Sequence, residues 1–225
     1  MHRLGVGAMR LAAEPDGARS ASMELLRCAV ELGVTLIDTA HLYGWGANEE
    51  LIAEALHPYP EELLVPVHCI DPAIPLADQV GVLADLRDEG KIGHIGLSEV
   101  SAAQLAEVRE TVDIAGVQNR YNILDREHDP VVDACEQACI AFLPWRPVVA
   151  GTAGATAVIA VVARELDATA TQVVLAWLLR RSRVIAPIPG TASLGHLTEN
   201  LTAAGVEITD DQYERLDRIA APKVQ

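Results

Sequence analysis

The first apolar run of the chain is Arg3-Leu4-Gly5-Val6-Gly7-Ala8-Met9, and its glycines help to decide between two ways of building the fold. The run is apolar on both faces, as expected of a buried parallel strand. A doubly wound dinucleotide-binding sheet would place a G-x-G-x-x-G turn directly after such a strand. No glycine follows Gly7 where this fingerprint needs its third, so we favour a barrel over an open sheet.

Outward from this run, short strand-like segments alternate with amphipathic helices. The expected strands cover residues 3–9, 35–38, 63–69, 92–97, 114–118, 141–144 and 184–188. The expected helices cover residues 20–32, 48–56, 76–89, 101–112, 129–138, 157–166, 171–181, 193–204 and 209–219. Such alternation predicts a parallel sheet with helices on its faces. Because no linker or break in composition interrupts it, we expect one domain over residues 1–225.

The composition of the chain limits its partners. Half of the 225 residues are hydrophobic and the net charge is −15, which argues against nucleic acid and against an anionic membrane surface. No uncharged apolar run reaches the roughly 18 residues of a membrane span, and the first residues do not resemble a signal peptide. The four cysteines have no zinc-type spacing, so no metal site is expected. We therefore expect a cytoplasmic protein with a small-molecule substrate.

Polar residues stand at the carboxyl ends of most expected strands, and in a barrel these ends converge on one mouth. The first group is Ile37-Asp38-Thr39-Ala40-His41-Leu42-Tyr43-Gly44, and His68 ends a later strand. A phenol has a pKa of about 10, so Tyr43 would need a nearby cation to act as an acid near neutral pH. Alone, each group is weak evidence, because a turn aspartate or a strand-end histidine is more often structural.

A further group follows the last expected strand, which runs through Pro189-Gly190 into a helix. Its first turn carries Thr191 and Ser193. Free backbone N–H groups and hydroxyls at a helix N-terminus can bind an anion, and the late strands of barrels often bind phosphate in this way.

These groups belong to a longer series of motifs in a fixed order. The series consists of residues 4–11, Gly33-Val34-Thr35-Leu36-Ile37-Asp38-Thr39-Ala40 with Tyr43-Gly44, residues 48–52, Glu89-Gly90-Lys91-Ile92-Gly93-His94-Ile95-Gly96-Leu97-Ser98, Val117-Gln118-Asn119-Arg120-Tyr121-Asn122, Phe142-Leu143-Pro144-Trp145 and residues 189–200. Over nearly the whole chain, this series resembles the aldo-keto reductases, specifically their bacterial branch. The resemblance implies a TIM-type (β/α)8 barrel and NADP(H) as a possible cofactor.

The resemblance also assigns roles to residues. Tyr43 matches the tyrosine that protonates the substrate carbonyl, Asp38 the aspartate that helps to lower its pKa, and His68 the histidine that orients the carbonyl oxygen. Residues that match cofactor-binding positions are Ser98, Gln118, Gly190, Thr191, Ser193, His196, Glu199 and Asn200. We expect Trp45, Trp145 and Arg146 to line a substrate pocket at the mouth.

Three positions depart from the family pattern. The family's catalytic lysine ends the third barrel strand, yet no lysine precedes Lys91 here. Residues 61–68 read as the head of the third strand joined to the tail of the fourth, so one αβ step is missing. This predicts seven core strands, in a barrel that changes its shear, stays open or borrows a partner as a homo-oligomer. Arg146 stands near an aromatic position, and Glu99 stands where many members carry asparagine.

Three functions remain open at this stage. The first is a divergent enzyme that performs non-redox acid–base chemistry, such as cyclisation, dehydration or isomerisation, with Tyr43, His68 and Asp38 in the biosynthesis of a small metabolite. The second is an NADPH-dependent carbonyl reductase with a rebuilt site, in which Arg146 supplies the cation. The third is a dinucleotide sensor or an inactive remnant of the family.

Overall fold

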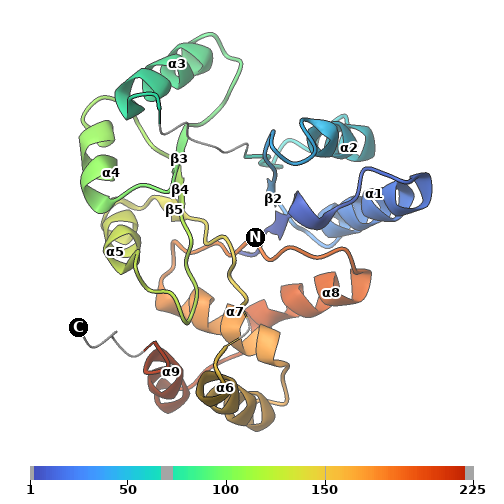
Figure 1. The fold of residues 1–225 in the computed structure, drawn as a ribbon, viewed down its shortest axis with the longest axis vertical. Helices are drawn as coiled ribbons and strands as arrows, with labels where there is room; N and C mark the ends of the chain where they lie inside the picture. The colour runs from blue at the N-terminus through green and yellow to red at the C-terminus, as the bar shows by residue number, and fades with distance from the viewer. Residues whose placement is uncertain (1–2, 67–72, 150, 221–225) are drawn as a thin grey trace.

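The computed structural model describes residues 3–66, 73–149 and 151–220, which fold into short parallel strands with helices around them (Figure 1). The strands are β1 (Val6–Gly7), β2 (Ile37–Asp38), β3 (Gly96–Ser98), β4 (Gly116–Gln118) and β5 (Ala141–Phe142). The helices are α1 (Asp16–Glu31), α2 (Ala47–Leu56), α3 (Leu76–Asp88), α4 (Ala102–Arg109), α5 (Asp129–Ala138), α6 (Ala153–Glu165), α7 (Ala170–Arg181), α8 (Leu194–Thr202) and α9 (Asp210–Asp217), with 3-10 turns at Ala8–Arg10 and Ala203–Gly205.

Strand pairing runs around the molecule through seven positions. On one side β1 pairs with β2, and Leu36 bridges in parallel to Leu64. On the other side Gly7 bridges to Gly190, and Ile185 of the same late segment bridges to Phe142 of β5. The order β5-β4-β3 completes the series. Within the described ranges no backbone hydrogen bond joins residues 64–66 to β3, so the described pairing leaves the barrel open at this point, which is one of the outcomes expected from a missing αβ step.

The seven expected strands all fall at these positions, but the regular parts are shorter. The first run was expected over residues 3–9, yet β1 covers two residues and a 3-10 turn begins at Ala8. Helices α1 and α6 each begin four residues earlier than expected, at Asp16 and Ala153. Helix α1 begins at Asp16, directly after Pro15, and the side chain of Thr152 caps α6 by accepting a hydrogen bond from the backbone N–H of Ala155.

Gly7 of β1 and Gly5 just before it are required by close backbone contacts. A Cβ atom on Gly5 would lie 2.8 Å from the carbonyl oxygen of Leu36, and one on Gly7 would lie 2.9 Å from that of Ile188. Both distances are shorter than van der Waals contact, so any side chain would separate β1 from its neighbours. Gly5 and Gly7 do not form a dinucleotide-binding turn. Their lack of side chains instead allows β1 to pack between β2 and the last strand segment.

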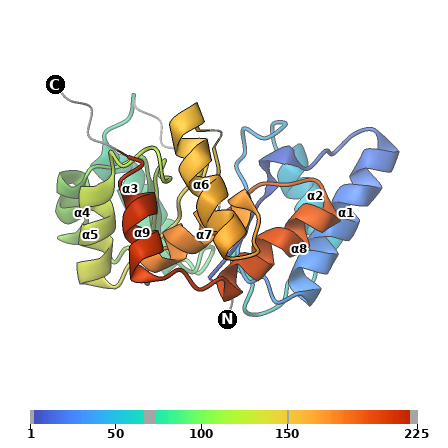
Figure 2. The ribbon, with the colours of Figure 1, turned by 90° about the horizontal axis from the view of Figure 1, so that it is seen from below.

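The helices cover the strands on their outer side. Helix α1 packs against α2 and α8, and α7 packs against α8 and α6. Helices α6 and α9 lie side by side (Figure 2), and Figure 1 shows them farther from the labelled strands than α7. Helix α7 is buried from Val173 to Leu179, and the ring of its Trp177 stacks on that of Tyr121, which meets the ring of Phe142 edge to face. No helix of the described segments is long and apolar enough to cross a membrane.

Candidate functional site

Residues from several strands meet at the carboxyl end of the barrel, which we call the mouth. Asp38 is the last residue of β2, Ser98 of β3 and Gln118 of β4. In the parallel register Ser98 lies directly opposite Gln118, so their side chains share one face of the sheet. Because parallel strands place their carboxyl ends on the same side, these three predicted residues lie at one end of the fold, where such barrels carry their active sites.

Asp38 and Gln118 are joined directly. The side-chain amide Nε2 of Gln118 donates a 2.5 Å hydrogen bond to Oδ1 of Asp38, and both residues are buried. Their strands are not neighbours in the sheet order, so the bond crosses the interior of the barrel. The other amide atom, Oε1 of Gln118, is buried and has no hydrogen-bond partner in the described parts of the chain. A buried acceptor without a protein partner indicates a place where a ligand can donate a hydrogen bond.

Tyr43 lies in a loop that hydrogen bonds hold against the start of the chain. The buried Asn48 accepts a 2.8 Å bond from the Thr39 hydroxyl and donates a 3.0 Å bond to the carbonyl of Ala8. The backbone N–H of Tyr43 donates to the carbonyl of Ala40. The loop after β2 is thereby fixed, and Tyr43 follows Asp38 closely in it, with its side chain half-buried.

The contacts of the described residues do not place Trp45 or His68 in a substrate pocket. Trp45 is 77% exposed and its ring meets that of His41 edge to face, so it forms no buried wall. Its place in a substrate pocket remains a prediction. His68 lies outside the described residues, so its position relative to Tyr43 also remains a prediction.

Across the mouth, Glu99 contacts Trp145. The indole Nε1 of Trp145 donates a 2.5 Å hydrogen bond to Oε1 of Glu99, which also accepts a 2.8 Å bond from the backbone N–H of Arg120. Arg146 follows with an exposed side chain, and its guanidinium has no hydrogen bond or ion pair among the described residues. The contact between Glu99 and Trp145 could not be foreseen, because 46 residues separate the two.

Three residues near the mouth adopt a strained backbone. Trp45, Glu99 and Arg146 have φ angles of 53°, 52° and 50°, in the left-handed region that side chains other than glycine disfavour. Such conformations persist only where the surroundings enforce them, and they gather at functional sites. All three follow strands at their carboxyl ends, which supports the mouth as the functional end of the protein.

The predicted anion site follows the last strand segment. Ser193 caps α8 by accepting a 3.4 Å hydrogen bond from the N–H of His196, and its own N–H donates to the Thr191 hydroxyl over 3.0 Å. Thr191 and Asn200 are buried, whereas Ser193 and His196 are exposed. Glu199 accepts a 2.6 Å bond from the Thr169 hydroxyl at the start of α7, so it also has a structural role.

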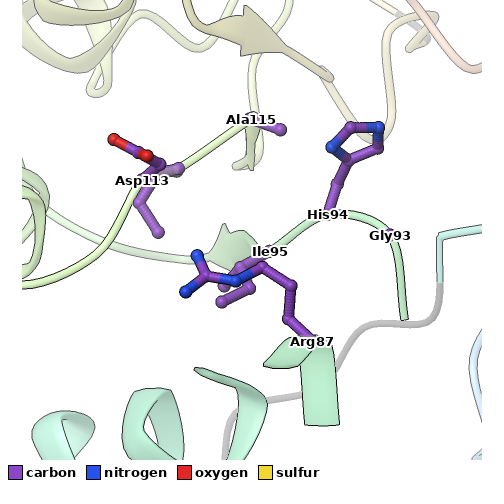
Figure 3. Close-up of a pocket in the computed structure, with 7 residues that line it drawn as sticks. Arg87, Gly93, His94, Ile95, Asp113 and Ala115 are labelled. Carbon is purple, nitrogen blue, oxygen red and sulfur yellow. The ribbon is translucent and has the colours of Figure 1, made fainter. Parts of the chain in front are cut away.

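A cavity that the sequence does not predict lies at the opposite end of the barrel. It has a volume of about 360 Å³ and lies before the first residues of β3 and β4, where Arg87, His94 and Asp113 face it (Figure 3). The remaining lining residues are Gly93, Ile95, Ile114 and Ala115. Active sites of such barrels lie at the carboxyl ends of the strands, so we place the candidate site at the mouth and not in this cavity.

Comparison with known proteins identifies the family. The sequence profile described as "Aldo/keto reductase family" matches residues 3–65 and 62–221. The chain belongs to the aldo/keto reductase family. The two matched pieces meet at residues 62–65, within the predicted join between the third and fourth strands. The family match thus breaks where the sequence indicates a missing αβ step.

Two relatives are similar over almost the whole chain. A protein of Schizosaccharomyces pombe named uncharacterized oxidoreductase C215.11c is 33% identical over 96% of this chain and 86% of its own length. Pyridoxine 4-dehydrogenase of Escherichia coli is 34% identical over 98% of this chain and 95% of its own length. The alignments span 264 and 272 positions, more than the 225 residues of this chain, so both relatives carry residues without a counterpart here.

Solved structures support the same fold. A thermostable aldo-keto reductase crystallised with the inhibitor epalrestat superposes with a TM-score of 0.88, at 26% identity over 97% of this chain and 95% of the other. An aldo-keto reductase of Klebsiella pneumoniae in complex with NADPH superposes with a TM-score of 0.84, at 21% identity over 99% and 92%. The second likeness establishes the barrel fold.

Proposed function

We propose that this protein is an oxidoreductase that uses NADP(H) to interconvert a carbonyl group and an alcohol on a small molecule. The observation that carries this proposal is the buried pair of Asp38 and Gln118 at the mouth. The unpartnered Oε1 of Gln118 is an acceptor suited to the amide N–H of a carboxamide, and Ser98 lies beside it in register. These residues therefore fit the nicotinamide end of the cofactor.

In the proposed reaction each of a few side chains has one role. NADPH, when bound, would supply the hydride that reduces the carbonyl carbon. Tyr43 gives its hydroxyl proton to the carbonyl oxygen, and His68 orients this oxygen. Asp38 lies at the end of the strand before the Tyr43 loop, and Gln118 fixes its carboxylate by a hydrogen bond. Trp145 and Arg146 border the substrate.

The acidity of Tyr43 requires a source of positive charge, because an unperturbed phenol has a pKa of about 10. Lys91 does not supply it, since its ammonium pairs with Glu89 over 2.6 Å and its side chain is 64% exposed. The Gln118 amide is neutral. We propose Arg146 as the cation, because its guanidinium stays charged at all accessible pH values and has no partner among the described residues.

The outer end of the cofactor would lie at the start of α8. Gly190 and Thr191 lead into the helix, and the exposed Ser193 and His196 stand in its first turn. We propose that these residues bind the adenosine 2′-phosphate and that Glu199 and Asn200 lie near the adenine. Backbone N–H groups at a helix N-terminus favour an anion there.

Pyridoxine and pyridoxal are the first substrates to test, because the E. coli relative is named for oxidation of pyridoxine. The test begins with a titration of the purified protein with NADPH, followed by cofactor fluorescence, with NADH as the control. A panel of aldehydes and ketones, including pyridoxal, then measures NADPH consumption. We expect selective NADPH binding, turnover of at least one carbonyl, and a loss of turnover in Tyr43→Phe with binding retained.

Two matched variants locate the cofactor. Ser193→Ala and His196→Ala should weaken NADPH binding and leave the weaker NADH binding unchanged, because NADH has no 2′-phosphate. Thr198→Ala, at an exposed position later in α8, serves as the control. Equal loss for both cofactors in the first two variants would contradict a phosphate site at this helix.

A second candidate function is acid–base chemistry without hydride transfer. It is favoured by the absence of a lysine before Lys91 and by the neutral amide that contacts Asp38. Both named relatives described above are oxidoreductases, which is why we place this candidate second. Failure to bind NADPH would favour it over reduction. NADPH binding without turnover of any carbonyl in the panel would instead favour a dinucleotide sensor.

A further inference from the structure

Glu99 makes an unusual connection at the mouth. It follows β3 directly and holds a left-handed backbone with a φ of 52°. Its Oε1 accepts two hydrogen bonds, one from the Trp145 indole at 2.5 Å and one from the backbone N–H of Arg120 at 2.8 Å. A residue that is neither glycine nor asparagine keeps such a backbone only when its contacts enforce it.

The three partners come from the ends of three adjacent strands. Glu99 extends β3, Arg120 lies two residues beyond β4, and Trp145 lies three residues beyond β5. The carboxylate of Glu99 thus reaches past the end of β4 to Trp145, which lies in the segment after β5. Within the described ranges β3 is the last strand of its sheet, next to the incomplete side of the barrel. The contact therefore joins the segments that follow β3, β4 and β5 at their carboxyl ends.

The backbone behind Trp145 is already fixed by pairing beyond the regular strands. Arg120 and Trp145 form a parallel bridge, and the N–H of Trp145 donates to the carbonyl of Asn119 over 3.2 Å. The buried side chain of Asn119 donates to the Val100 carbonyl over 2.7 Å, next to Glu99 in sequence. His128 approaches the second carboxylate oxygen of Glu99 at 3.9 Å. The indole of Trp145 extends from this paired backbone, and its Nε1 donates to the carboxylate of Glu99.

We propose that Glu99 is a positioning residue, which holds the indole of Trp145 in one orientation so that the ring forms a fixed wall of the mouth. That substrate and nicotinamide contact the Trp145 ring rests on the proposed function. That Glu99 holds the ring in one orientation does not rest on it. A Trp145 ring that cannot rotate would keep the reacting groups at a constant distance, and small displacements of reacting groups reduce reaction rates strongly.

The locking can be measured without cofactor. The protein contains three tryptophans, and fluorotryptophan labelling gives one fluorine NMR signal for each. Trp145→Phe identifies the signal of Trp145, and Trp177, which is fully buried, provides an internal reference. We expect the Trp145 signal of the unaltered protein to be sharp and distinct from that of the exposed Trp45.

Three variants separate the carboxylate from the strained backbone. Glu99→Gly removes the carboxylate and relieves the φ angle, so the protein should fold while the Trp145 signal broadens and moves toward the position of an exposed ring. Glu99→Gln keeps an oxygen acceptor for both donors and should restore the signal. Glu127→Gln, at an exposed carboxylate that lies 3.9 Å from the Arg120 guanidinium, should leave the signal unchanged.

Kinetics then test the use of the wall. With a carbonyl substrate found in the panel above, we expect Glu99→Gly to lower kcat/KM by about tenfold, the scale of one hydrogen bond to a charged group, and Glu99→Gln to recover most of the loss. An unchanged Trp145 signal in Glu99→Gly overturns the locking, whatever the enzyme does. A protein that binds no NADPH but shows the signal change contradicts the proposed function and leaves the locking supported.

Discussion

The side-chain amide of Gln118 donates a 2.5 Å hydrogen bond to the carboxylate of Asp38 across the interior of the barrel. The family resemblance places a lysine among the partners of this aspartate, and this chain has none before Lys91. The neutral amide of Gln118 therefore hydrogen-bonds the buried carboxylate of Asp38, where the family resemblance predicts a cation. Among the described residues, the bond joins the pair β1-β2 to the sheet β3-β4-β5, and these two groups of strands are not paired directly with each other.

Removal of this donor should destabilise the protein. Gln118→Leu keeps the approximate volume of the side chain and deletes a hydrogen bond to a buried charged group, a bond that contributes about 1.5–3 kcal/mol. We expect the free energy of unfolding to fall by this amount in urea denaturation followed by circular dichroism. Ser98→Ala is the control, because the Ser98 hydroxyl makes no hydrogen bond among the described residues. Equal losses in the two variants would contradict the importance of the bond.

Replacement of Gln118 by lysine should bring a cation back to the mouth. A positive charge near a phenol favours its ionised form, so Gln118→Lys is expected to lower the pKa of Tyr43. Ultraviolet difference titration of tyrosinate measures this in the protein without cofactor. The same titration in a Tyr43→Phe background identifies the signal, and the shift should disappear there. A titration curve identical to that of the unaltered protein would show that the new ammonium lies too far away.

Alkaline stability should depend on Tyr121. Burial and a 2.6 Å hydrogen bond to Asp129 raise the pKa of Tyr121 above its usual value. The folded protein therefore holds this proton at pH values where the unfolded chain, with a tyrosine pKa of about 10, releases it. Stability is present below about pH 10 and falls as the pH rises further.

Tyr121→Phe tests this linkage. We expect the variant to lose about 1 kcal/mol near neutral pH, because the hydrogen bond to Asp129 is removed. It should also show a weaker decline in the free energy of unfolding above about pH 10. Tyr59→Phe, at a tyrosine that is 44% exposed, should change neither property. If the free energy of unfolding falls as steeply above about pH 10 in Tyr121→Phe as in the unaltered protein, another titrating group causes the pH dependence.

The cysteines should differ in reactivity. Burial raises the pKa of the Cys135 thiol to about 12, whereas Cys139 is exposed. Because the thiolate is the reactive form, iodoacetamide near neutral pH should label Cys139 rapidly and Cys135 only after unfolding. Peptide mass spectrometry with and without urea measures both sites. Fast labelling of Cys135 in the folded protein would contradict its burial.

Cys139 also ends α5 in a left-handed conformation with a φ of 56°. Glycine adopts this conformation without steric cost and is the usual residue at such a helix end. We expect Cys139→Gly to raise the free energy of unfolding by about 1 kcal/mol. Cys28→Gly, inside α1, should lower it instead.

The sequence predicts the architecture better than it predicts the contacts. The alternation of strands and helices follows from local pattern, and the fold agrees with it. The join at residues 61–68 follows from family order, and the break of the family match at residues 62–65 lies within it. The hydrogen bonds from Gln118 to Asp38 and from Trp145 to Glu99 link residues 80 and 46 positions apart. They depend on how the barrel curves and on a left-handed turn at Glu99, which its residue type disfavours.

The pairing of β1 has a consequence for the synthesis of this protein. The N–H groups of Gly5 and Gly7 donate to the carbonyls of Pro187 and Pro189, so the first strand completes its hydrogen bonding with residues near the end of the chain. A ribosome makes about 5–20 residues per second, and β1 therefore waits many seconds for its partner. Until then its edge is open to other chains, and contacts of such long sequence separation form slowly. Nascent chains that stop before residue 187 should consequently be the forms most dependent on chaperones.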